Sequence, residues 1–250
     1  MTPAETQFER ELEIFRTEAE GGTQFLYAYL AVHAVAAHRK AVHRLLNEAP
    51  LFWNTCLAAL QTASFMALGR IFDHDSDHNL SKLLRITQDH PEIFSKAALG
   101  RRKQGNNPEA PMWLTEYLRD SYEPTAHDFR RIRAHVRKRR KIYESNYRDI
   151  RHKWFAHKAV SDQTEIAALF VKTNTRELQQ LFAFLRSLYE VLWELFFNGS
   201  KPVLGPLRYS VKRFRGSRLT HRRPRGIHEK ITHEAKQFLR SASALLPKGR

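Results

Sequence analysis

The sequence predicts an all-α fold, a bundle of four long helices with shorter helices between them. In four long stretches, apolar residues recur mostly three and four positions apart, which is the spacing of one face of an α-helix. We find no convincing strand and no internal repeat. With 250 residues, 42% of them hydrophobic, the chain is long enough to bury one sizeable core.

Three helices are predicted in the first 72 residues. Residues 3–20 have an amphipathic pattern, and the pair Gly21-Gly22 is expected to break or bend that helix before a second one over residues 23–47. Pro50 marks the start of a third run, which is apolar nearly all round and so fits the centre of a bundle. Polar residues dilute the hydrophobicity of this run, and we expect a buried core helix rather than a membrane span.

Shorter helices are expected in the middle of the chain, followed by two long ones. Asn79 or Ser81 is placed to cap a short helix, and residues 91–99 are expected to form another. A capping box with Asp in place of Glu, at Thr125 to Asp128, predicts a long helix that runs to about residue 157. A similar start at Asn174 predicts the last long helix, which ends before Gly199.

Most of the positive charge lies at the C-terminus. The chain has 42 Lys and Arg against 26 Asp and Glu, a formal net charge of +16, and residues 201–250 hold 14 Lys and Arg against two Glu, a net +12. We therefore predict a helical domain over residues 1–198 and a basic, partly disordered tail over residues 199–250, with one amphipathic helix over 227–246. Such an excess suggests an anionic partner, nucleic acid first.

The cellular location is predicted from cysteine use and from the N-terminus. The single cysteine, Cys56, excludes an intramolecular disulfide, and the first residues do not have the pattern of a secretory signal. A reducing cytoplasm is therefore the expected location.

One short stretch combines groups suited to cleaving RNA. Arg151 is followed by the polar His152 and, six positions on, by His157. Arginine offers a permanent positive fork for phosphate, and histidine transfers protons near neutral pH. Because RNA carries its own nucleophile, the 2′-hydroxyl, these groups are sufficient without a metal. On an ideal helix Arg151 and His157 point roughly 120° apart, so we expect either an irregular helix or a site shared by two chains.

This motif, in a four-helix setting, resembles that of the HEPN superfamily: Arg, a polar residue, about four residues, then His. A second stretch, Leu68-Gly69-Arg70-Ile71-Phe72-Asp73 followed by Asn79-Leu80-Ser81-Lys82-Leu83-Leu84, is similar to the abortive-infection U-type branch of that superfamily. The likeness spans about residues 1–198. It implies a homodimer in which two copies of the motif form one cleft, and metal-independent RNA cleavage that leaves a cyclic phosphate and a 5′-hydroxyl.

The resemblance also implies roles for the motif residues. Arg151 would stabilise the charge of the transition state, and His157 would act as general acid or base. His152 would fill the polar position, where family members usually have Asn or Asp.

Further residues are assigned from charge and spacing. Arg70 and Asp73 are expected to pair across one helical turn. The candidate phosphate contacts are Arg130, Arg133, Arg137, Lys141, Lys153, Arg213, Arg215, Arg222, Arg223 and Arg225. A solvated helix face and a flexible tail, or a tail that contacts an acidic protein, remain open as alternatives. No metal or cofactor is expected, because the acidic turn after Phe72 lacks the Gly and Glu of a calcium loop.

The functional prediction is a metal-independent endoribonuclease, an effector of phage defence or of a toxin–antitoxin pair. Its expected partners are RNA, a second copy of the chain and an antitoxin protein, and no membrane. The alternative is an all-α module without catalysis that binds RNA, an antitoxin or a nucleotidyltransferase. Loss of RNA binding on deletion of the tail, with no cleavage product, would favour that alternative.

Overall fold

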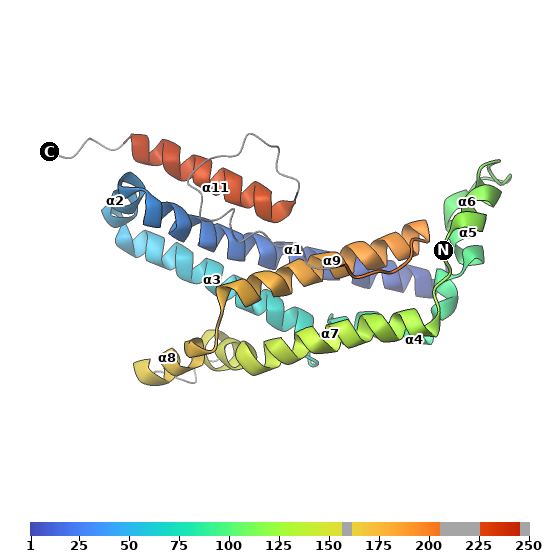
Figure 1. The fold of residues 1–250 in the computed structure, drawn as a ribbon, viewed down its shortest axis with the longest axis horizontal. Helices are drawn as coiled ribbons and strands as arrows, with labels where there is room; N and C mark the ends of the chain where they lie inside the picture. Colours follow the sequence, from blue (N-terminus) through green and yellow to red (C-terminus); the bar gives the residue numbers. More distant parts are fainter. Residues whose placement is uncertain (157–161, 206–225, 246–250) are drawn as a thin grey trace.

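The computed structural model describes residues 1–156, 162–205 and 226–245, and these residues contain helices and no strand. The all-α prediction is confirmed (Figure 1). In chain order the elements are α1 (Pro3–His38), α2 (Lys40–Glu48), α3 (Pro50–Phe72), α4 (Leu80–Asp89), the 3-10 helix η1 (Pro91–Phe94), α5 (Lys96–Gln104), α6 (Leu114–Asp120), α7 (Ala126–Asn146), the π-helix η2 (Ile150–Ala156), α8 (Gln163–Val171), α9 (Thr175–Asn198) and α11 (Ile227–Ala244).

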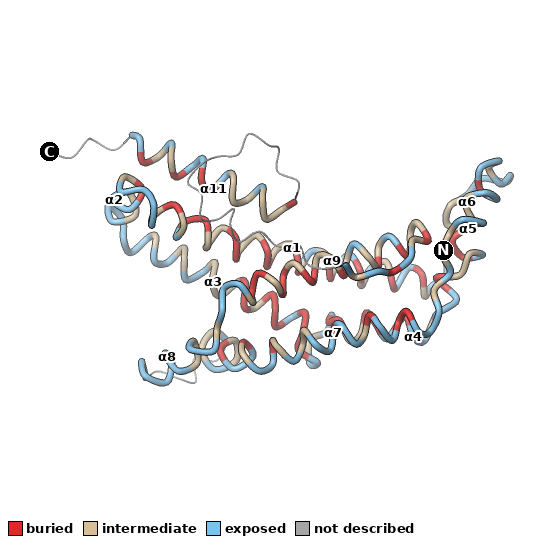
Figure 2. The backbone as a smooth tube through the Cα atoms, viewed as in Figure 1, coloured by how far each residue is buried: buried red, intermediate tan, exposed pale blue. Residues whose placement is uncertain are grey.

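The core lies where α1, α3, α7 and α9 face one another. Figure 2 shows buried residues along the inner sides of these long helices. The side chains of Phe8, Leu12, Phe182 and Phe196 are almost fully buried in this cluster. At about 1.5–3 kcal/mol for each large apolar side chain removed from water, this cluster is the main source of stability.

Gly21 and Gly22 do not break the first helix, so that prediction is wrong. α1 continues from Pro3 to His38. A Cβ on Gly22 would lie 2.5 Å from Phe182 Cε1 and 2.8 Å from the Cβ of Ala67, so this glycine lets α1 approach α9 and α3 closely. The helix ends instead at Arg39, whose backbone is extended with φ −136° and ψ 105°.

Helix α3 is buried only in its second half, which corrects the prediction of burial all round. Its residues from Ser64 onward enter the core, whereas Leu51 is 81% and Phe52 60% exposed. Figure 2 shows this change along α3, from exposed and half-buried residues in its first half to mostly buried residues in its second. Among the helices that the structure describes, α3 is the one long and apolar enough to cross a bilayer by length and composition, and 39% of its most apolar window is buried inside the protein. The buried half is the part that carries the site described below.

The predicted helix starts are confirmed. The Asn79 side chain accepts hydrogen bonds from the backbone N–H groups of Ser81 and Lys82, and Asn174 caps α9 in the same way. At Thr125 the Asp128 carboxylate accepts the backbone N–H at 2.9 Å. Burial raises the pKa of Asp128, but the hydrogen bonds from Thr125 and Tyr122 outweigh it and hold the pKa below its ordinary value.

Two predicted helices are interrupted. The short helix expected over residues 91–99 is divided into η1 and α5, because Ser95 has an extended backbone and caps α5 through its side chain. The helix expected from residue 125 to about residue 157 ends as α7 at Asn146, and η2 follows after a short break.

The helix predicted near the C-terminus is present as α11, which packs on α1 and α2. Leu239 of α11 is 1% exposed and lies in a small core with Val32, Val35 and Val42. Part of the segment after residue 198 is therefore attached to the bundle. Residues 206–225, which contain the predicted tail cations, lie outside the described residues.

Candidate active site

The two sequence stretches singled out above meet in space. Asp73 follows the last residue of α3, and Arg151 and His152 lie near the start of η2, which packs on α3. The ring of Phe65 on α3 lies 5.0 Å from that of Phe155 on η2 and 6.0 Å from that of Tyr147. This aromatic contact holds the motif segment against the C-terminal half of α3.

The described part of the motif, residues 151–156, lies on an irregular helix, and an irregular helix was one of the two alternatives expected from the spacing. Tyr147, with φ −127° and ψ −27°, ends α7, and the chain resumes as a π-helix at Ile150. In a π-helix each hydrogen bond spans five residues instead of four, and such segments are frequent at functional sites. Tyr147 and Ile150 are buried on either side of the break, so the segment is anchored by packing.

Asp73 is the centre of a polar cluster. Its side chain is 8% exposed, and its Oδ2 lies 3.0 Å from Arg151 Nη1 and 3.5 Å from His152 Nε2. Arg148 Nε lies 4.0 Å from Oδ1, and the Tyr143 hydroxyl donates a 3.0 Å hydrogen bond to the same oxygen. One carboxylate thus contacts groups from both α7 and the motif.

Arg151 is held firmly and is little exposed. Its side chain is 17% exposed, and Nη1 also lies 3.0 Å from His152 Nε2. Its Nε is buried and has no hydrogen-bond acceptor. A buried donor without an acceptor costs about 1–3 kcal/mol. Asp73 fixes the guanidinium, and an incoming oxyanion can reach only the exposed part of this side chain.

Gly69 makes room for this arginine. A Cβ at Gly69 would lie 2.6 Å from Arg151 Nε and 3.2 Å from its Cδ and Cζ. Any larger residue at position 69 would displace the Arg151 guanidinium. The sequence stretch from Leu68 to Asp73 therefore supplies both the space and the carboxylate for Arg151.

Tyr143 is a permanent donor to Asp73. Burial raises the pKa of the Tyr143 hydroxyl well above its ordinary value, and the charge of Asp73 and their hydrogen bond raise it further. Burial also raises the pKa of Tyr147, whose hydroxyl donates to the Asn174 carbonyl at 3.1 Å. Both tyrosines therefore remain protonated at physiological pH and act as positioning groups rather than as bases.

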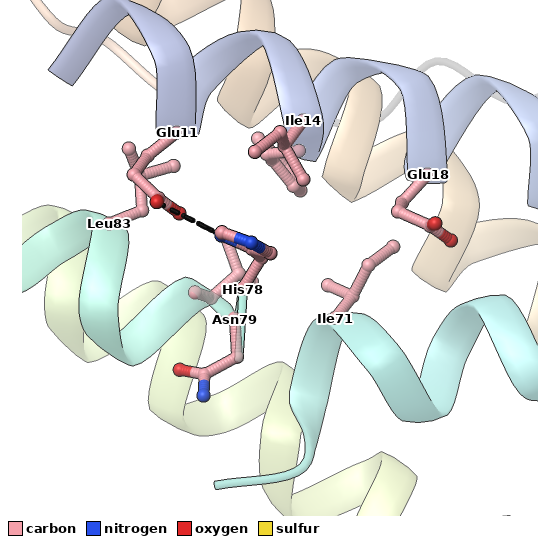
Figure 3. A pocket seen from close by; sticks show the side chains of 9 residues that line it. Glu11, Ile14, Glu18, Ile71, His78, Asn79 and Leu83 are labelled. Carbon is pink, nitrogen blue, oxygen red and sulfur yellow. Dashed lines mark hydrogen bonds and ion pairs between the residues drawn. The ribbon is translucent and has the colours of Figure 1, made fainter. Parts of the chain in front are cut away.

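Helix α1 fixes the end of α3 and the turn that follows it. Figure 3 shows Glu11 contacting His78 across this junction, with Glu18 further along the same side of α1. The distance from Glu11 Oε1 to His78 Nδ1 is 2.9 Å. Arg70 Nε lies 2.7 Å from Glu18 Oε2. The space enclosed between these residues is about 10 Å³, room for about one water molecule, so this junction is structural and too small for a ligand.

The predicted pair of Arg70 and Asp73 is wrong. Arg70 points toward Glu18 on α1, and no ion pair joins it to Asp73 within the described residues. Asp73 instead contacts Arg151, which lies 78 positions further along the sequence. A spacing of three residues allowed the local pair, but the backbone of Asp73 is extended and takes its carboxylate away from that face.

The other predicted residues are placed as follows. Arg130, Arg137 and Lys141 are exposed along α7, Arg133 is half-buried, and none of the four forms an ion pair with a described acid. Lys153 pairs with Asp149 at 3.0 Å. His157, Arg213, Arg215, Arg222, Arg223 and Arg225 lie outside the described residues. The described residues contain no group of three or more side chains able to hold a metal ion.

Sequence reasoning missed three contributors to this cluster. Neither Tyr143 nor Gly69 was predicted to take part in the site. Arg148 lies three positions before Arg151 and four before His152, which places it on the same side of a helix. That spacing could have identified Arg148 from the sequence. No feature of the sequence indicated that Asp73 would be the partner of Arg151.

The comparison with known proteins identifies the family. The family model described as AbiU2, a HEPN family, matches residues 5–211. No curated protein and no solved structure matches the chain. The match includes both stretches that meet at Asp73 and most of the described helices. The chain therefore belongs to the AbiU2 family of HEPN proteins and has the HEPN-type helical domain.

Proposed function

We propose that the protein is a metal-independent endoribonuclease that acts in abortive infection. Family membership implies an abortive-infection or HEPN-type role, and the cleavage of RNA is the finer step proposed here. The observation that supports it most is the position of Arg151, whose Nη1 lies 3.0 Å from Asp73 Oδ2 while 17% of its side chain remains exposed. A fixed, partly exposed guanidinium suits the stabilisation of a phosphorane-like transition state.

The proposed reaction needs no group beyond the substrate and the side chains. A general base removes the proton of the 2′-hydroxyl, and the 2′-oxygen attacks the adjacent phosphorus. The bond from phosphorus to the 5′-oxygen breaks, and a general acid protonates that oxygen. The products are a 2′,3′-cyclic phosphate and a 5′-hydroxyl. His157 is assigned to proton transfer because it fills the motif's histidine position, and His152 to the polar position beside Arg151.

The proposed active form is a homodimer. In such a dimer the two copies of the motif form one cleft, so an arginine from one copy and a histidine from the other can act on one phosphate. The proposed partners are RNA and an antitoxin protein that restrains the enzyme. The proposed location is the cytoplasm, and no membrane partner is proposed.

A cleavage assay on total RNA with EDTA present tests the proposal. We expect the native chain to cut RNA and leave cyclic-phosphate ends. Arg151→Ala and His157→Ala should each lower the rate by about 10²-fold or more, since each removes a group that acts in the transition state. EDTA should leave the native rate unchanged.

Matched controls separate the motif from general charge effects. His135 and Arg85 are exposed on α7 and α4, and His135→Ala and Arg85→Ala should cut at the native rate. Equal cutting by all five proteins would indicate a contaminating nuclease and contradict the assignment. RNA binding by the native chain without any product would favour the module without catalysis.

A further inference from the structure

A second basic site lies at the corner where α1 ends and α2 begins, away from Asp73. The extended backbone of Arg39 turns the chain between these helices. The corner encloses an open hollow of about 720 Å³, lined by two alanines and by His38, Arg39, Lys40, His43 and Arg44. All five side chains with ionisable groups in this lining are basic.

Among the residues that the structure describes, no carboxylate forms an ion pair with the cations of this corner. The sequence has no Asp or Glu between Glu20 and Glu48. Arg39, Lys40 and Arg44 are exposed, and none forms an ion pair with a described residue. By contrast, Arg16, Arg70 and Arg186 each contact a carboxylate on the surface. The corner therefore has positive charge without paired carboxylates, whereas several arginines elsewhere on the described surface form ion pairs.

Helix α11 adds one more cation to this corner, Arg240. Burial lowers the pKa of Arg240, and the neighbouring charge of Arg39 lowers it further. Arg240 Nε is buried without a hydrogen-bond acceptor. Like charges brought together by folding cost free energy that a bound anion recovers.

An exposed aromatic side chain lies at the start of the helix that follows α2. α3 begins at Pro50, two positions after the end of α2, and Phe52 in its first turn is 60% exposed. The Phe52 ring packs edge-on against Trp53, with centroids 5.5 Å apart. Single-stranded nucleic acid is bound by cations that contact its phosphates and by exposed rings on which its bases stack.

We propose that the α1–α2 corner binds the phosphate backbone of single-stranded RNA, as a contact separate from the site at Asp73. This inference rests on the proposed RNA substrate. α3 runs from the corner to Asp73, and its 23 residues span about 35 Å at 1.5 Å each. One phosphate cannot contact both places, so the corner acts on RNA affinity and not on the chemical step.

The test measures binding of an RNA that cannot be cleaved. Fluorescence anisotropy of a 2′-O-methyl oligonucleotide, which lacks the nucleophile, reports binding by the full chain whether or not the protein is a nuclease. The variant is Arg39→Ser with Lys40→Ser and Arg44→Ser. Its Kd should rise on the order of tenfold, and the slope of log K against log salt should fall by about 2, because each single-strand phosphate contact contributes about 0.7.

The control removes the same charge from the other end of the molecule. Arg10, Arg85 and Arg101 are exposed on α1, α4 and α5, and their triple Ser variant should keep the native Kd and slope. Replacing Arg39 and Arg44 by Lys should keep most of the affinity, because a phosphate contact needs charge rather than a guanidinium.

Three results would overturn the inference. They are an unchanged Kd in the corner variant, an equal loss in both triple variants, and binding of anionic phospholipid vesicles through the corner without binding of the oligonucleotide. Failure of the proposed nuclease function is a separate result. It would appear as absence of product from cleavable RNA while corner-dependent binding of the oligonucleotide remains.

Discussion

Asp73 organises the candidate site because it is a carboxylate at the end of a buried helix. With 8% of its side chain exposed, it is shielded from water and contacts Arg151, His152 and the Tyr143 hydroxyl together. A buried carboxylate is tolerated only where donors and cations compensate it. The same contacts therefore stabilise Asp73 and fix the arginine.

Gly69 should be needed for activity rather than for folding. In Gly69→Ala the new Cβ would lie 2.6 Å from Arg151 Nε, so the arginine must move, while alanine favours the helix by about 1 kcal/mol. We expect a loss of about 10²-fold in RNA cleavage, the scale of a 1 Å misplacement of a catalytic group. Thermal unfolding should show a change of only a few degrees.

Gly21 provides the control for that prediction. It lies within α1, and a Cβ there would meet its nearest neighbour, Phe25, at an ordinary 3.9 Å. Gly21→Ala should keep native cleavage and raise the free energy of unfolding by about 0.5–1 kcal/mol. Native activity in Gly69→Ala would show that the close contact has no functional role.

At the scale of helices, the starts of helices were predictable from the sequence, whereas the close contacts between helices were not. The caps at Asn79, Thr125 and Asn174 depend on side chains within three residues and were read from the sequence. The continuity of α1 depends on Phe182 and Ala67 approaching Gly22 from other helices. The spacing of apolar residues within one helix does not report contacts with other helices. From the sequence alone, the pair Gly21-Gly22 therefore looked like a helix break.

In the candidate site, too, local features were predictable from the sequence and the long-range contact was not. The motif at Arg151 was recognisable from its residue types, and the 120° separation left an irregular helix as one of two alternatives. Its partner Asp73 was not, because the contact joins the end of α3 to η2. The apolar composition of α3 also predicted burial along its whole length, but no other described helix covers Leu51 and Phe52.

Helix α11 should stabilise the bundle through one apolar contact. Leu239 is 1% exposed against α1 and α2, whereas the adjacent Phe238 is 61% exposed. Leu239→Ala should lower the free energy of unfolding by about 2–4 kcal/mol, through lost burial and a residual cavity. Phe238→Ala should change it by less than about 0.5 kcal/mol. Urea unfolding followed by circular dichroism measures both, and equal effects would contradict the packing of α11 on the bundle.

At the scale of the whole molecule, the segment that holds most of the positive charge is not separate from the packed bundle. Residues 201–250 hold +12 of the formal +16, yet α11 within that segment joins a core with α1 and α2. It also brings Arg240 to the corner at Arg39. The basic C-terminal segment thus contributes to the folded surface, and the corner and the Asp73 site lie at opposite ends of α3.

A site divided between two chains makes a prediction about mixtures. Arg151→Ala and His157→Ala should each be inactive alone. In a mixed dimer, the first variant supplies His157 and the second supplies Arg151, so one of the two sites is intact. Random pairing at equal amounts puts half the chains in mixed dimers, and restored cleavage should reach about a quarter of the native value.

Co-expression with two different affinity tags allows the mixed dimer to be isolated and its mass measured before the assay. A control pairs Arg151→Ala with the double variant Arg151→Ala, His157→Ala, which has no intact site in any combination and should remain inactive. Cleavage by the first mixture but not by the second requires the two residues to act from different copies. An inactive mixed dimer of confirmed composition would contradict the divided site, and the π-helix would then have to bring Arg151 and His157 together within one chain.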